Sequence, residues 1–111
     1  MSHYAFMAPI KSGKAAVWKQ YVQEMTTSRK DAMQASRKKL GLEKEEVWLQ
    51  HTPNGDFAVV YIEAKNPGEV MQKMMTSEDP FDKWFREKVL IEVHGMDPSA
   101  PPPPPNEEIL H

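Results

Sequence analysis

The chain has 111 residues, of which 40% are hydrophobic and 27% are charged, and its formal net charge is −2. This length suffices for one domain with a single core, and the nearly balanced charge gives no broad positive field, so we expect no nucleic-acid or membrane partner. There is no cysteine, which excludes disulfides and thiolate chemistry and is typical of a cytoplasmic protein.

The first third of the chain predicts a strand followed by a long, broken helix. Residues 3–8, "HYAFMA", alternate imperfectly, which predicts a strand. Apolar residues then recur at helical spacing over residues 13–39. The poor helix formers before Arg29 predict a break near Ser28, where Ser28 and Asp31 make a capping-box pattern, and Gly41 ends the helix. The basic run at residues 29–39 is interpreted as a solvated helix face.

Residues 45–64, "EEVWLQHTPNGDFAVVYIEA", predict a hairpin. Two apolar runs flank Asn54-Gly55, the dipeptide most typical of a two-residue turn, which would pair Thr52 with Phe57. Side chains alternate along strands, so the hairpin has an aliphatic and an aromatic face. The aliphatic face holds Val47, Leu49, His51, Ala58, Val60 and Ile62. The aromatic face holds Trp48, Gln50, Thr52, Phe57, Val59 and Tyr61.

Two more helices follow the hairpin. Residues 66–77, "NPGEVMQKMMTS", predict a short one. A second is expected over residues 79–94, with Asp79 as its N-cap, Asp82 completing a capping box and Gly95 stopping it.

The chain ends in a proline-rich segment. Residues 101–105 are five prolines, and a polyproline rod from Ser99 would extend on the order of 20 Å. We therefore expect a domain at residues 1–98 and a C-terminal arm at residues 99–111. The arm would end in a short strand that pairs with a sheet edge of its own chain or of a neighbouring subunit.

The order of elements predicts an α+β protein with the ferredoxin-like βαββαβ pattern and an antiparallel sheet. Helices in such a small domain cover one face of the sheet, so the aromatic face needs another partner. We expect that partner to be a second copy of the chain, in a homodimer. The alternative is that the arm of the same chain covers this face. The expected dimer interface comprises Trp48, Gln50, Phe57, Val59 and Tyr61.

Four segments carry a resemblance to a known family. They are "SGKAAVWKQYVQEM", "SRKDAMQASRKKLGL", "EEVWLQHTPNGDFAVVYIEA" and "DPFDKWFREKVLIEVHG". Together they resemble a bacterial domain-of-unknown-function family within the dimeric α/β-barrel superfamily, which includes antibiotic-biosynthesis monooxygenases, stress-responsive barrel proteins and polyketide cyclases. The resemblance implies a bacterial protein in which two ferredoxin-like subunits press their sheets together. No activity or catalytic residue transfers with it.

Among the four histidines, His51 is the candidate general base, with Tyr61 or Tyr4 as a polar partner. The alternative is a histidine at the sheet rim, bonded to the backbone or to water. His94 ends the last helix, where a positive imidazole would interact well with the helix dipole. The histidines lack metal-ligand spacing, and we expect neither a metal nor a cofactor.

A second candidate site is a pocket for a small apolar molecule. Trp84, Phe85, Met71 and Met74 would line it, although core packing explains the same stripe. Three functions remain open. The chain binds a small apolar molecule or has another role without catalysis. It is a cofactor-independent monooxygenase, isomerase or cyclase acting between sheet and helices. Or it is purely a structural or interaction module.

Overall fold

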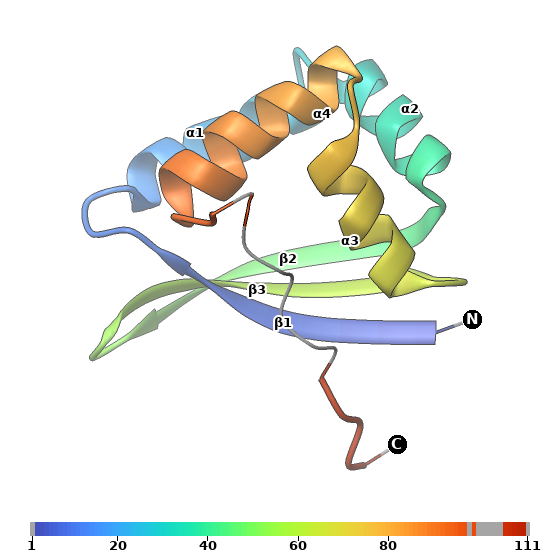
Figure 1. Cartoon of the computed structure of the whole chain (residues 1–111). Helices are drawn as coiled ribbons and strands as arrows, with labels where there is room; N and C mark the ends of the chain where they lie inside the picture. Colours follow the sequence, from blue (N-terminus) through green and yellow to red (C-terminus); the bar gives the residue numbers. More distant parts are fainter. Residues whose placement is uncertain (1, 98, 100–105, 111) are drawn as a thin grey trace.

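The computed structural model describes residues 2–97, 99 and 106–110 (Figure 1). Three strands form one sheet, and the helices all lie on one side of it, while the described C-terminal residues run past the opposite side (Figure 1). The elements are β1 (Ser2–Ile10), α1 (Ala15–Thr26), α2 (Lys30–Leu40), β2 (Leu42–Thr52), β3 (Gly55–Ala64), α3 (Pro67–Thr76), α4 (Pro80–Phe85) and the π-helix η1 (Arg86–Val93).

The sheet is antiparallel, in the order β1-β3-β2, so β3 is central and β1 and β2 are edge strands. This α+β architecture is compatible with a ferredoxin-like fold. The described residues nevertheless hold one strand fewer than the predicted βαββαβ pattern, because residues 106–110 form no strand. The proline rod at residues 101–105 lies outside the described residues.

The arm contacts the sheet through Asn106, whose side-chain amide donates to the backbone oxygen of Ala5 in β1. Beyond that contact, Ile109 is 84% exposed and Leu110 is 91% exposed. Residues 106–110 therefore bury no apolar side chain against the sheet.

The predicted break in the first helix is confirmed, since α1 ends at Thr26 and α2 begins at Lys30. The hydroxyls of Thr26 and Thr27 both donate to the backbone oxygen of Gln23, at 3.1 and 2.7 Å, and compete there with the helical pattern. The N-cap residue of α2 is Arg29, which makes no side-chain capping bond, so the expected capping role of Ser28 is wrong.

The hairpin forms, but its predicted register is wrong by two residues. Pro53 and Asn54 make the turn, and Thr52 lies opposite Gly55 instead of Phe57. The cause is the Thr52 hydroxyl, which donates to the Gly55 oxygen at 2.7 Å and accepts from the Asn54 amide at 3.2 Å. Because side chains alternate with a period of two, this shift leaves both predicted faces unchanged.

The last predicted helix consists of two parts. Asp79 caps α4 as expected, accepting from the Phe81 and Asp82 amides at 2.9 and 3.4 Å. From Arg86 onward the turns widen into the π-helix η1, a rare conformation. Asp82 does not complete a capping box. The Asp79 amide donates instead to the Ser77 hydroxyl at 3.2 Å, and Asp82 points into the protein.

The core lies between the helices and the face of the sheet that they cover. Ala58 and Ala64 of β3 are fully buried and small, which lets the helices approach the central strand closely. No helix among the described residues is long and apolar enough to cross a membrane. The core residues are Ile10, Trp18, Met25, Leu40, Ala58, Ile62, Ala64, Val70, Met74, Phe81, Phe85, Val89, Leu90 and Val93.

The end of α2 provides a test of the fold. Gly41 has φ 85°, and a Cβ there would meet no atom within 4 Å, so Gly41→Ala should cost about 1–2 kcal/mol of unfolding free energy through backbone strain alone. Gly68 lies inside α3 with ordinary room for a Cβ, so Gly68→Ala should be neutral or stabilise by about 0.5 kcal/mol. Urea unfolding measures both, and equal effects would contradict this reading of the helix end.

Candidate functional site

Among the described residues, no helix or strand covers the sheet face opposite the helices, here called the open face (Figure 1). The pairing register and the alternation of side chains define it. It comprises His3, Ala5, Met7 and Pro9 of β1, Lys44, Glu46, Trp48 and Gln50 of β2, and Phe57, Val59, Tyr61 and Glu63 of β3.

The centre of the open face is apolar. Met7, Val59 and Trp48 form one row across the three strands, because Met7 and Trp48 both pair with Val59. Met7 is 55% exposed and Trp48 is 50% exposed, while Val59, Phe57 and Tyr61 are half-buried among their neighbours. Contiguous exposed apolar side chains of this size are typical of an interaction surface.

One end of the open face is polar. The His3 Nδ1 atom lies 2.6 Å from the Tyr61 hydroxyl, and the Lys44 ammonium lies 2.9 Å from the Glu46 carboxylate and 3.8 Å from that of Glu63. Burial raises the pKa of Tyr61, and the Glu63 carboxylate raises it further. The Glu46 carboxylate raises the pKa of Lys44, so both groups keep their protons at neutral pH.

The catalytic candidates His51 and Tyr61 do not converge. His51 lies near the hairpin turn on the helix-facing set, with its side chain 69% exposed and its Nδ1 atom 2.7 Å from the Asp56 carboxylate. Tyr61 belongs to the open face, on the opposite side of the sheet. Because side chains alternate along a strand, the sequence alone places His51 and Tyr61 on opposite faces of the hairpin.

The four residues predicted to line a pocket belong to the packing of the helices. Phe85 and Met74 are core residues, and Met71 and Trp84 are partly buried. The Trp84 ring packs edge-on against Tyr21, and the Arg29 guanidinium lies 4.0 Å from its centroid. The two hollows described next are lined by other residues.

A hollow of about 600 Å³ lies beside α2, and we call it the α2 hollow. Its apolar lining comes from Met25, Met33 and Leu42, which belong to α1, α2 and β2. Its charged lining consists of Lys30, Arg37, Lys38 and Glu43. A smaller hollow of about 310 Å³ lies on another side of α2, where Lys39, Lys73 and Ser77 contribute to it.

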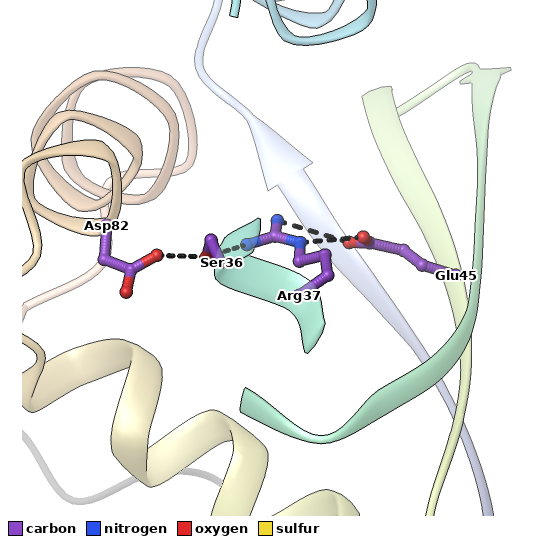
Figure 2. A network of polar contacts seen from close by, with 4 residues as sticks. All are labelled: Ser36, Arg37, Glu45 and Asp82. Carbon is purple, nitrogen blue, oxygen red and sulfur yellow. Dashed lines mark hydrogen bonds and ion pairs between the residues drawn. The ribbon is translucent and has the colours of Figure 1, made fainter. Parts of the chain in front are cut away.

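A buried polar network joins the helices to the sheet (Figure 2). Asp82 is 1% exposed and accepts from the hydroxyls of Ser36 and, at 2.6 Å, Ser77. Arg37, also buried, places its Nε atom 2.9 Å from the Glu45 carboxylate and its Nη1 atom 3.5 Å from the Ser36 hydroxyl (Figure 2). The network satisfies each buried group and holds α2 against both α4 and β2.

Sequence reasoning missed this network because its members are far apart along the chain. Ser36 and Asp82 are separated by 46 positions. The only local signal was a serine and an arginine on the helix stripe that carries Leu40. Among the described residues, no group of three or more histidine, aspartate or glutamate side chains is arranged to hold a metal ion.

No protein-family model matches the chain, and no curated protein is significantly similar to it. The function proposed below is therefore based on the geometry of the described residues.

The Ser36–Asp82 contact predicts a specific loss of stability. Ser36→Ala leaves a buried carboxylate with one donor fewer, so the free energy of unfolding should fall by about 1–3 kcal/mol. Ser28 is exposed in the turn before α2, and Ser28→Ala should change it by less than about 0.5 kcal/mol. Equal losses for the two variants in urea unfolding would contradict a structural role for the network.

His94 predicts a pH dependence of stability. Burial lowers the pKa of His94, although its Nδ1 atom lies 2.8 Å from the Pro9 oxygen, a contact that acts in the opposite direction. The neutral imidazole is thus favoured, not the cation expected at a helix end. The unfolded chain takes up the proton first, so the stabilisation is complete above about pH 6.5 and is lost as the pH falls through the folded pKa.

The measurement is the difference in unfolding free energy between the parent protein and His94→Gln as the pH is lowered from neutral to mildly acidic. Groups that titrate equally in both proteins cancel in this difference. It should shrink on acidification, and a constant difference would contradict the buried, neutral histidine.

Proposed function

We propose that the protein acts as a homodimer in which two open faces pack on each other, and that each subunit binds a small apolar molecule. The observation that carries the dimer is the apolar row of Met7, Val59 and Trp48, half-exposed at the centre of a sheet that has helices on its other face only. A layer that is apolar on both sides needs a covering partner on each side to remove that surface from water.

A second copy fits the open face better than the chain's own arm does. With the described residues 106–110 of the arm in place, Trp48 is still 50% exposed, and Ile109 and Leu110 are themselves exposed. The face also carries charges of both signs at its polar end, Lys44 against Glu46 and Glu63, so an identical face is not excluded by repulsion. A twofold axis near Val59 would stack two apolar rows.

This assembly is the arrangement of the dimeric α/β barrels, the superfamily that the sequence resembles. Within the proposal, the domain comprises residues 1–98 and the arm comprises residues 99–111. The absence of cysteine and the resemblance to a bacterial family support a place in the bacterial cytoplasm.

The α2 hollow supports the binding function. Its volume of about 600 Å³ falls within the range typical of small-molecule sites. Two methionines, Met25 and Met33, supply adaptable apolar surface on its wall. Binding at this hollow replaces the pocket expected around Trp84. Without small-molecule binding at the α2 hollow, the chain would be an interaction module alone.

Trp48→Asp tests the dimer. A carboxylate at the centre of a desolvated interface should raise the dimer dissociation constant at least about 30-fold, equivalent to about 2 kcal/mol. Val47→Asp is the matched control, because Val47 is the adjacent residue, is 41% exposed and belongs to the other face of β2. Sedimentation velocity measures both, and a parent protein that is monomeric at high micromolar concentration would contradict the proposal.

A further inference from the structure

The α2 hollow has an arrangement of charge that its apolar lining alone does not require. One face of α2 forms a wall, because Lys30, Met33, Arg37 and Lys38 recur at helical spacing. The end of α1 and the start of β2 lie opposite, contributing Met25 and Leu42. Cations thus border an apolar surface along one helix.

The apolar part of the hollow can hold a hydrocarbon body. Met25 is almost fully buried and joins the core, while Met33 and Leu42 are half-buried and pack against it. A ligand lying on them would remove apolar surface from water, which contributes roughly 25 cal/mol per Å². Methionine side chains adjust to irregular shapes, so this surface favours flexible chains over one rigid outline.

The cations at the rim differ in their availability. Arg37 already has partners within the protein, since its guanidinium lies 2.9 Å from the Glu45 carboxylate and 4.6 Å from the Phe85 ring centroid. Among the described residues, neither the Lys30 nor the Lys38 ammonium lies within ion-pair distance of a carboxylate. The hollow therefore has three cations and one anion, Glu43, in a chain whose net charge is −2.

We infer that the α2 hollow binds an amphipathic anion, a small molecule with an apolar body against Met25, Met33 and Leu42 and a carboxylate head group between Lys30 and Lys38. This inference rests on the proposed small-molecule binding and names its ligand class. The lysines supply attraction to the head group, and the apolar surface supplies the rest of the affinity. An uncharged head group would lack this attraction, and a cationic head group would be repelled by the two ammonium groups.

The test compares three probes of equal chain length, decanoate, decanol and decylammonium, by calorimetric titration of the full chain. Each titration stays below the solubility limit of decanol and below the micelle concentrations of the two ionic probes. Decanoate should bind about tenfold more tightly than decanol, and decylammonium should bind most weakly. The preference for decanoate should weaken as salt is added, because ions screen exposed charges.

Variants locate the head group. Lys38→Glu should weaken decanoate binding about tenfold. Lys39→Glu is the matched control, since Lys39 is the next residue of α2 but lines the smaller hollow, and it should leave binding unchanged. The double variant Lys30→Glu/Lys38→Glu should reverse the preference and bind decylammonium more tightly than decanoate, which also proves that this variant is folded.

The outcomes separate the inference from the function on which it rests. Equal binding of decanol and decanoate, or equal effects of Lys38→Glu and Lys39→Glu, would overturn the anion inference and leave apolar binding intact. If Met33→Asp abolishes binding of decanol and decanoate, the hollow is the site. If none of the three probes binds the parent protein, both the inference and the proposed binding function are wrong.

Discussion

The covering of the sheet on one face only is the constraint on which the rest of this protein depends. Three strands are too few to bury an apolar layer by curling around it, and every helix lies on the same side (Figure 1). The covered face is closed by small alanines in β3 and by the aromatic residues of α4. The other face leaves the apolar side chains of Met7 and Trp48 about half exposed to water.

The buried polar network fixes the position of α2 relative to the sheet and to α4. Apolar packing alone would let α2 slide over the sheet, since methionine and leucine contacts tolerate small shifts. The Ser36–Asp82 and Arg37–Glu45 contacts fix α2 against α4 and β2 at the same time (Figure 2). The position of the α2 hollow follows from that placement, because the same helix turn that buries Arg37 directs Lys38 outward.

Much of this fold was predictable because it depends on local periodicity. The two faces of the hairpin were assigned correctly even though the register was not, since a shift of two residues preserves alternation. The register itself depended on a side-chain contact, Thr52 with Gly55, that competes with the Asn54-Gly55 turn signal. The expected last strand does not form in residues 106–110 for a different reason, because this short segment has too little apolar pattern to determine a pairing.

The candidate site was harder to predict because it depends on residues distant in sequence. Asp82 fitted a capping box locally, yet two serines, one of them 46 residues away, hold it in the interior. The run at residues 29–39 predicts a solvated face, and its three lysines are exposed as that reading requires, while Ser36 and Arg37 are buried. His51 and Tyr61 were proposed together although alternation placed them on opposite faces, a signal that was present and overlooked.

The most direct measurement of the central claim uses the absence of cysteine from the chain. A thiol introduced as Met7→Cys reports on the centre of the open face. A thiol introduced as Val47→Cys reports on the helix-facing side of β2. If a second copy covers the open face, thiol labelling at residue 7 slows as the protein is concentrated from low micromolar to near millimolar, while labelling at residue 47 keeps its rate. Labelling at residue 7 that is fast and independent of concentration, together with a sedimentation mass of 12.7 kDa, would contradict the account.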